Sequence, residues 1–407
     1  MIVRPFPALR PATSDLAARI ACPPYDVMDT EEARAMAAGN PKFFLRVIRP
    51  EIDLAPDADP SADSTYAHAG EVFAGLQKDG SLTREAAPSL YLYRQTMGEH
   101  VQTAVVACCA TDEYRNGTIL QHEKTRKDKE DDRTRHIRAI RAQTGQVFLC
   151  YKDRAEIDGI VARETASAPI YDFTSSDGIR HTVWKVAATE ALAEAFKAVP
   201  KAYIADGHHR SAAAVRVSSQ LREEGVPAGN EADFFMACLF PASQLRILPY
   251  NRCVRDLNGM TPEEFLKAAM ARGFSAAAIP VPENLPDHSC AVRLPSGWYR
   301  LSWSLTDAQA ADPVARLDVS RLQEDLLAPV LGIGDPRTDK RIYFVGGIRG
   351  TGELERDVAS GKAAVAFAMN PTTIDQMMAI ADAGDTMPPK STWFEPKLRS
   401  GLLIHTF

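Results

Sequence analysis

The segment "KAYIADGHHRSAAAVRV", residues 201–217, restricts the possible folds of this chain more than any other segment does. The apolar run Ala202–Ala205 predicts a buried strand, and the alanine-rich stretch that begins at His208 predicts a helix. Asp206 and Gly207 stand between the two. A strand that enters a helix through glycine leaves the first helical N–H groups exposed, and such groups attract anions. The segment therefore predicts an α/β unit with an anion-binding turn.

The polar residues of this turn suit the binding of phosphate. Gly207 lets a phosphate approach the backbone closely, and Arg210 offers a planar pair of donors that matches two phosphate oxygens. Asp206, at the end of the strand, is placed to hold a magnesium ion that bridges phosphates. The structural alternative is that Asp206 caps the helix while His208 and His209 lie on the surface.

Zinc is disfavoured at the same turn. The side chains of adjacent helical residues diverge by about 100°, so His208 and His209 cannot converge on one ion. The sequence also has no HExxH or CxxC pattern that would complete a zinc site.

A second group of polar residues follows the apolar segment "GTIL". It begins with His122 and Glu123, where a strand is expected to end and where active sites of α/β proteins gather. Glu123 can take a proton from a substrate hydroxyl, and Thr125 can bind a phosphate or a metal. Lys129 and Arg133 follow at spacings that predict a second cationic clamp. The rest of this run, rich in both signs of charge, predicts a solvated helix with charge pairs.

Two further groups lie near the ends of the chain. The segments "RPFPALRP" and "CPPYDVM" supply three candidate substrate-binding residues, Arg4, Tyr25 and Asp26. The segment "MPPKSTWFEPKLRSG" has a proline pair followed by a candidate anion-binding loop, Lys390, Ser391 and Thr392. The alternative for both groups is a set of turns that holds a terminus against the fold.

Composition narrows the class of protein. A content of 45% hydrophobic and 25% charged residues is ordinary for a globular enzyme. The net charge of −6 provides no general basic field for nucleic acid. The longest apolar runs are far shorter than the ~18 residues that span a bilayer. The seven cysteines stand mostly in apolar segments, as buried free thiols do. We therefore expect a reduced, cytoplasmic protein without a membrane or nucleic-acid partner.

The alternation of strand and helix patterns predicts an α/β fold of the mixed α+β kind, with flanking helices on a mixed sheet. We expect an N-terminal core with the candidate active site over residues 1–245. A C-terminal α/β part would cover 246–407, and its tail, 387–403, would return to the core. The proline-rich loop "IPVPENLPDHS" is another place for a boundary between the parts.

Six motifs occur in order along the chain: "RPFPALRP", "PPYDV", "HEKT" with "KEDDR", "YIADGHHR", "ILPYNR" and "MPPKSTWFEPKL" followed by "SGL". Together they resemble the family catalogued as domain of unknown function 1015, from residue 1 to about residue 403. The DGHHR motif in turn resembles the ParB/sulfiredoxin superfamily, in which a GxxR-type turn binds nucleotide phosphates. Within that superfamily, the free serine kinases carry DGHHR and phosphorylate L-serine with ADP or ATP and magnesium.

This resemblance implies a ParB/sulfiredoxin-like core of strand, GHHR turn and helix. Gly207, His208, His209 and Arg210 would cradle phosphates, and Asp206 would assist magnesium or the serine hydroxyl. Sulfiredoxins place a reactive cysteine in this motif, so the two histidines of this chain argue against sulfinic acid reduction. The motif does not locate the glutamate of the kinases. Glu123 is the candidate base on chemical grounds, and we expect it to share a cleft with Asp206.

The sequence thus predicts a phosphoryl-transfer enzyme that uses ATP or ADP and Mg²⁺, with serine or phosphoserine as its small substrate. One alternative is a phosphatase on O-phosphoserine or a similar phosphomonoester. Another is a ParB-like nucleotide-binding switch or DNA-associated protein. The sequence does not separate the kinase from the phosphatase direction, and a homodimer is compatible with it.

Overall fold

The computed structural model describes residues 1–407, which form two compact units. Unit 1 comprises Met1–Gln121, Thr125–Leu245 and Pro396–Phe407, and unit 2 comprises His122–Lys124 and Arg246–Glu395. The main break therefore follows Leu245. Of the tail expected to return to the core, the residues from Pro396 onward belong to unit 1.

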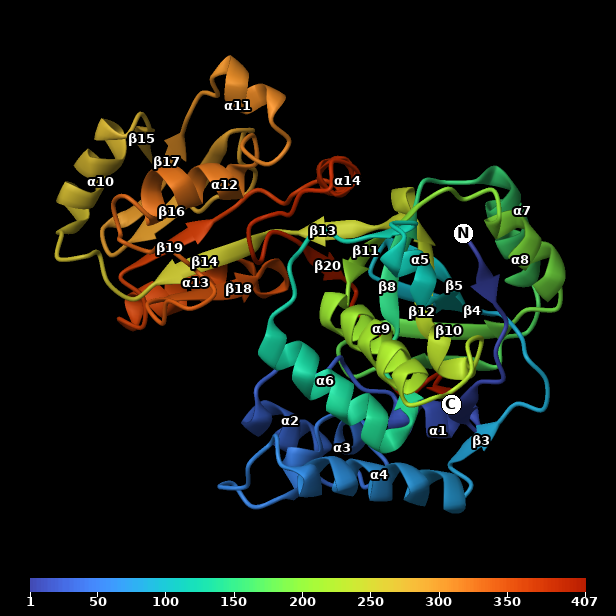
Figure 1. Ribbon diagram of the computed structural model, residues 1–407. Coiled ribbons are helices and arrows are strands. Elements are labelled where there is room, and N and C mark those ends of the chain that lie inside the picture. Colours follow the sequence, from blue (N-terminus) through green and yellow to red (C-terminus); the bar gives the residue numbers. More distant parts are fainter. The chain divides into compact units, whose positions relative to one another are not determined.

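Unit 1 is built on a nine-stranded sheet with the order β6-β11-β8-β12-β5-β4-β10-β9, and β1 pairs with β5 (Figure 1). Its strands are β1 (Val3–Arg4), β4 (Tyr91–Met97), β5 (His100–Ala110), β6 (Ile119–Leu120), β8 (Val147–Tyr151), β9 (Tyr171–Thr174), β10 (Arg180–Lys185), β11 (Ala202–Asp206) and β12 (Phe234–Pro241). The pairs β11–β6 and β12–β8 are parallel, and the other pairs are antiparallel. The predicted mixed sheet is confirmed.

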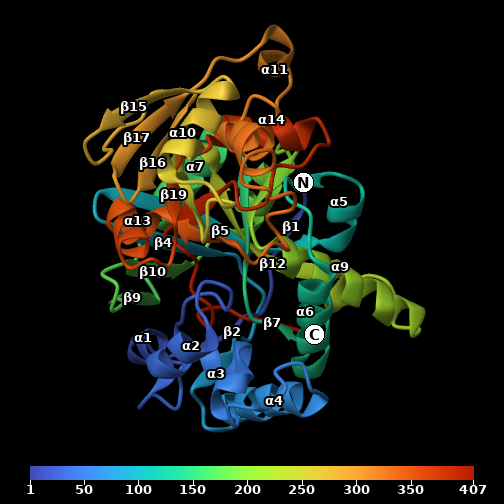
Figure 2. The same ribbon diagram turned by 90° about the vertical axis from the view of Figure 1, so that its left-hand side faces the viewer.

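Helices flank this sheet, as predicted. They are α1 (Ser14–Ile20), α2 (Thr30–Ala37), α3 (Leu45–Ile48), α4 (Asp63–Lys78), α5 (Thr111–Arg115), α6 (Lys127–Ile140), α7 (Ala155–Glu164), α8 (Thr189–Phe196) and α9 (His208–Glu223). One face of the sheet is covered by α7 and α8, because Ile157 and Phe196 pack in the same apolar cluster as Leu149 and Ile204. Figures 1 and 2 show α1–α4 gathered in a separate layer, which has its own apolar core.

The C-terminal segment forms backbone hydrogen bonds with several short elements of unit 1. Strand β21 (His405–Thr406) pairs with β7 (Ala142–Gln143), and β2 (Leu9–Pro11) pairs with β3 (Leu82–Arg84). Ile404 bridges to Leu9, and Ser400 bridges to Cys22. The last residues of the chain therefore complete a unit whose other elements come from its first 245 residues.

Unit 2 contains a six-stranded sheet in which every pair is antiparallel. In sheet order its strands are β15 (Ser275–Ile279), β17 (Gly297–Ser302), β16 (Ser289–Leu294), β19 (Val365–Ala368), β14 (Tyr250–Val254) and β18 (Ile342–Gly346), and β13 (Arg246–Leu248) pairs separately with β20 (Trp393–Glu395). Its helices are α10 (Pro262–Ala271), α11 (Asp307–Ala311), α12 (Asp318–Leu322), α13 (Gly350–Ala359) and α14 (Ile374–Asp382). The loop "IPVPENLPDHS" connects β15 to β16 inside this unit.

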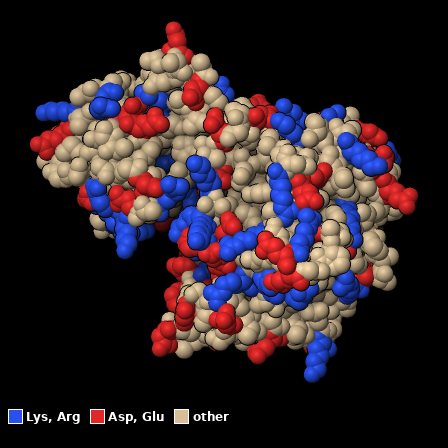
Figure 3. Space-filling model, in the orientation of Figure 1, with Lys and Arg blue, Asp and Glu red and all other residues tan.

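The charge distribution on the surface and the state of the cysteines match what the composition predicts, namely no general basic field and buried free thiols. Positive and negative side chains are interspersed over the face in Figure 3, which shows no continuous basic surface. All seven cysteines are buried and free. No helix of the chain combines the length and the apolar character that crossing a bilayer requires.

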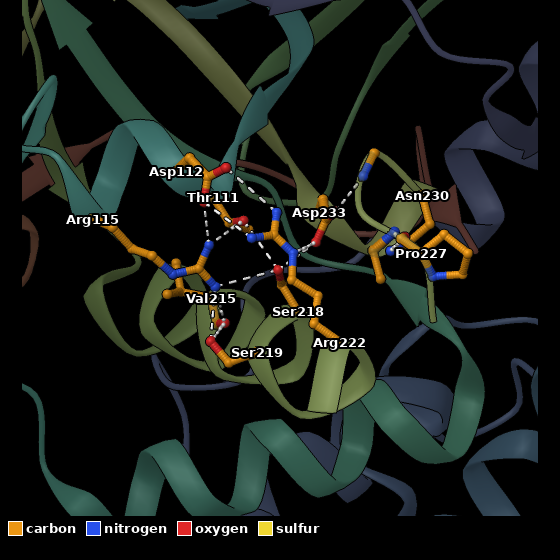
Figure 4. A network of polar contacts seen from close by, with 12 residues as sticks. Thr111, Asp112, Arg115, Val215, Ser218, Ser219, Arg222, Pro227, Asn230 and Asp233 are labelled. Atoms are coloured by element: carbon orange, nitrogen blue, oxygen red, sulfur yellow. Dashed lines mark hydrogen bonds and ion pairs between the residues drawn. The ribbon is translucent and has the colours of Figure 1, made fainter. Parts of the chain in front are cut away.

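A network of polar contacts fixes the C-terminal half of α9 (Figure 4). The carboxylate of Asp233 accepts hydrogen bonds from Ser218 Oγ at 2.6 Å, Arg222 Nε at 2.8 Å and the Gly229 N–H at 2.7 Å. Arg222 also lies 3.4 Å from Asp112 at the start of α5. Asp233 is only 3% exposed, so this carboxylate is a buried anchor for α9 and the loop that follows it.

We predict that Asp233→Asn lowers the free energy of unfolding by about 1–3 kcal/mol at pH 7, because it leaves buried donors poorly matched. Burial alone would raise the pKa of Asp233, but the hydrogen bonds from Arg222 and Ser218 hold this pKa below its usual value. The contribution is therefore full above about pH 4 and is lost as the pH falls through the lowered pKa. Denaturant unfolding at pH 7 and pH 3 measures it.

The exposed Asp57 supplies a matched control, since Asp57→Asn removes the same charge without a buried network. We expect this control to change stability by less than about 0.5 kcal/mol. A loss in Asp233→Asn that is the same at both pH values would contradict the charge-based explanation.

Candidate functional site

The turn between β11 and α9 has the conformation that the sequence predicts. Gly207 is the N-cap residue of α9 and has a φ of 95°, which non-glycine residues rarely adopt. A Cβ atom at Gly207 would lie 3.0 Å from Cζ and Nε of Arg210. Both the backbone angle and the closeness of Arg210 therefore require glycine at this position.

Asp206 lies between two cations. Arg210 Nη2 donates to Asp206 Oδ2 at 2.8 Å, and Arg210 Nη1 donates to the carbonyl of Gln146. Lys397 Nζ lies 3.7 Å from Asp206 Oδ1. Burial opposes the charge of Arg210, but Asp206, Asp26 and Tyr25 together raise its pKa. The three side chains Asp206, Arg210 and Lys397 carry a net charge of +1 in a largely buried setting.

This arrangement changes two roles expected from the sequence. Arg210 lies beneath Gly207 with both terminal nitrogens bonded to the protein, so it does not present an open fork to a phosphate. Asp206 is not the N-cap residue of α9, and His208 is buried rather than on the surface, so the structural alternative is also wrong.

Magnesium was expected at Asp206, and the residues around this carboxylate do not fit that ion. One oxygen accepts from Arg210 and the other faces Lys397. A divalent cation at the same carboxylate would meet two positive charges at close range. Asp206 is better suited to hold its two cations in place than to bind a metal.

His209 joins the starts of two helices. Its Nε2 accepts a hydrogen bond of 3.0 Å from the backbone N–H of Arg126, the N-cap residue of α6. The positive ends of the α6 and α9 dipoles are thereby brought together. Anions bind well at such helix ends, and the lysine at position 129 adds an exposed positive charge in the first turn of α6.

The side chains of Thr125 and Arg133 mainly contact other residues of the protein. Thr125 Oγ1 donates to Glu130 at 3.2 Å. Arg133 is 9% exposed, pairs with Asp132 at 2.7 Å and lies over the ring of Tyr25 at 4.1 Å. Burial opposes the charge of Arg133, while Tyr25 and Asp132 raise its pKa.

A cavity of about 30 Å³ brings several predicted residues together in unit 1. Tyr25, Arg133 and Arg210 line it, along with His136 and Ser400. Burial and the neighbouring Asp26 raise the pKa of Tyr25, so its hydroxyl stays protonated. A cavity of this size holds one or two water molecules or a single polar group, and not a nucleobase.

Other predicted residues lie elsewhere. Arg4 pairs with Glu231 at 2.5 Å and lies over Phe234, and it does not line the cavity. Asp26 is exposed and acts on Arg210 only through its charge.

Five predicted residues belong to unit 2, namely His122, Glu123, Lys390, Ser391 and Thr392. His122 Nε2 lies 3.3 Å from Thr392 Oγ1, which brings together two residues 270 positions apart. The expectation that Glu123 and Asp206 share a cleft stays a prediction, since they belong to different units.

Lys397 is the residue that sequence reasoning missed. It stands in the motif "FEPKL", shortly after the candidate anion-binding loop that contains Lys390. The available signal was the composition of that motif, because a lysine between proline and leucine is a candidate for a partly buried charge. Its partner, Asp206, could not be found from spacing, because 190 residues separate the two positions.

Comparison with known proteins identifies the family. Residues 3–320 match the family described as protein of unknown function (DUF1015), and the chain belongs to this family, as predicted. A comparison with curated proteins gave no match.

Several solved structures show remote similarity. A free serine kinase in complex with AMP has 13% identity and a TM-score of 0.36, covering 73% of this chain and 92% of its own. A variant free serine kinase in complex with ADP has 13% identity and a TM-score of 0.36, with the same two coverages. C-terminally truncated SbnI from Staphylococcus aureus has 11% identity and a TM-score of 0.41, covering 74% of this chain and 87% of its own. Similarity this remote carries no information about the substrate of this chain.

We predict that stability falls as the pH drops from about 6.5 towards 4, because two buried histidines stay neutral in the folded state. Burial and the charge of Arg133 lower the pKa of His136 to about 4, and burial and Arg399 lower that of His181 to about 3. The unfolded chain binds these protons near pH 6.5, so each histidine contributes a slope of up to about 1.4 kcal/mol per pH unit.

Denaturant unfolding across this pH range measures the slope. His136→Gln keeps a donor for the carbonyl of Val47, and it should remove about half of the slope. His100→Gln, at a half-buried position, is the control and should leave the slope unchanged. Equal slopes in His136→Gln, His181→Gln and the wild-type protein would refute this assignment.

Proposed function

We propose that unit 1 binds the terminal phosphates of ATP or ADP at the start of α9. The protein would transfer a phosphoryl group to the hydroxyl of a small hydroxy amino acid, with serine as the first candidate. The observation that carries this proposal is the positive site around the left-handed Gly207. There the starts of α6 and α9 meet at His209, and Asp206 holds Lys397.

Such a site matches the needs of phosphoryl transfer, in which a protein mainly positions groups and neutralises charge. The N–H groups of His208 and His209 would face the phosphate oxygens at the helix start. Lys397 and Lys129 would add compact positive charges. Arg210 would act through Asp206, because this ion pair fixes the carboxylate that orients Lys397.

In the proposed step the bond between the terminal phosphorus and its bridging oxygen breaks, and a bond from phosphorus to the serine oxygen forms. The hydroxyl proton passes to a base, and the shortened nucleotide leaves with the bridging oxygen. Glu123 is the base predicted from the sequence, while Tyr25 and Asp26 are the predicted substrate contacts. When bound, magnesium would neutralise charge on the nucleotide phosphates.

We predict that Lys397→Met weakens ADP binding about tenfold or more, because it removes a charge-assisted contact worth about 1.5–3 kcal/mol. Titration calorimetry measures the affinity, and circular dichroism checks the fold. Lys78→Met removes an exposed lysine of the same unit and should bind ADP like the wild-type protein. Equal affinities in a folded Lys397→Met variant would rule out this phosphate contact.

The reaction itself requires a product assay. We expect wild-type protein incubated with ATP or ADP and L-serine to form O-phosphoserine, detected by phosphorus NMR, and Glu123→Gln to lose turnover by orders of magnitude while ADP binding stays close to wild type. Release of phosphate from O-phosphoserine without nucleotide would instead favour a phosphatase. Nucleotide binding without any product would favour a switch.

A further inference from the structure

Arg252 is exceptional among the buried arginines of this protein. Four arginines are buried, and three of them pair with a carboxylate: Arg133 with Asp132, Arg210 with Asp206 and Arg399 with Asp177. Arg252, on β14 of unit 2, is 4% exposed and forms no ion pair. Its Nη1 donates to the carbonyl of Tyr250, and its Nη2 donates to the carbonyl of Lys390 at 3.1 Å.

A buried charge without a counter-ion is costly, and apolar residues of similar size usually replace such a group without loss. Burial lowers the pKa of Arg252 to about 10, and no carboxylate offsets this effect. Two carbonyl hydrogen bonds and the ring of Phe344, 5.6 Å away, stabilise the guanidinium, but they do not balance its full positive charge at this buried position. An anionic ligand would balance this charge, because the ligand supplies the missing negative charge.

The loop Pro388–Thr392 is bonded to Arg252 through the carbonyl of Lys390. Ser391 Oγ donates to the carbonyl of Pro388 at 2.5 Å, and Thr372 Oγ1 donates to the carbonyl of Ser391 at 2.9 Å. Ser391 therefore holds the loop together. Lys390 adopts a left-handed φ of 60° and is exposed, with Nζ 5.5 Å from the centre of the Tyr250 ring. The same loop therefore carries an exposed lysine and contacts a buried positive charge through its backbone.

We propose that the loop Pro388–Thr392 and Arg252 form an anion site in unit 2 that takes a phosphate group, either inorganic phosphate or the phosphate of a small phosphomonoester. Lys390 and the hydroxyl of Thr392 contact the anion directly. Arg252 fixes the carbonyl of Lys390 and supplies the buried positive charge that the anion balances. All residues of this site belong to unit 2, and the proposal does not depend on nucleotide binding at α9.

The test uses the full chain, with inorganic phosphate as the probe and sodium chloride at equal ionic strength as the reference. Phosphate should raise the midpoint of thermal unfolding of the wild-type protein. Lys390→Ala and Arg252→Met should each reduce the affinity for phosphate at least tenfold in titration calorimetry. The control Lys267→Ala removes an exposed lysine of α10 and should leave the affinity unchanged. O-phosphoserine and free phosphate are compared to identify the source of the group.

A second readout separates ligand binding from a structural role of Arg252. In buffer without phosphate, Arg252→Met should unfold at the same temperature as the wild-type protein or higher, because an unbalanced buried charge is removed. A lower midpoint, with phosphate affinity intact, would overturn the proposal, and so would a wild-type protein that gains no stability from phosphate. If Arg252→Met does not fold, the affinity of Lys390→Ala decides the question.

Discussion

The ion pair between Asp206 and Arg210 is the interaction on which the candidate site of unit 1 depends. It ties the end of β11 to the first turn of α9, and the bond from Arg210 to the carbonyl of Gln146 extends this tie to the start of β8. The guanidinium occupies the space beneath Gly207 that a side chain would need. Removing Asp206 would leave the buried guanidinium of Arg210 without its ion-pair partner, which usually costs several kcal/mol.

The position of Lys397 depends on a second buried arginine. Arg399 pairs with Asp177, and its Nε donates to His181 Nε2 at 3.4 Å. His181 Nε2 therefore accepts, so Nδ1 carries the proton and donates to the hydroxyl of Tyr93 at 2.8 Å. Ser175 lies 3.0 Å from the same ring, but a neutral imidazole held beside a guanidinium is a poor base. This cluster anchors the C-terminal segment, and it places Lys397 two residues earlier in the chain.

Local features of the fold could be predicted from the sequence, because local residues determine them. The apolar run Ala202–Ala205 and the following glycine gave the strand, the turn and the helix start correctly. The pairing of His209 with Arg126 and that of Asp206 with Lys397 could not be predicted, because strand order and the return of the C-terminal segment create them. The contact between Arg210 and Gln146 also depends on strand order. The sequence alone therefore predicts an Arg210 that faces a ligand, whereas in the structure Arg210 donates to the carbonyl of Gln146.

The buried guanidinium has a counter-ion within the protein in unit 1 and lacks one in unit 2. This difference determines whether a bound anion would change the stability of the unit or only occupy a preformed site. Arg210 is balanced by Asp206 within the protein, so a phosphate near α9 would meet a preformed site whose charges are already fixed. Arg252 donates to two carbonyls and lies over the ring of Phe344 but has no counter-ion, so a bound anion would supply an interaction that the fold itself lacks. A ligand of the first kind gains affinity from preorganisation, and its site is stable when empty. A ligand of the second kind stabilises the unit that holds it, because it balances a charge that would otherwise stay buried and uncompensated.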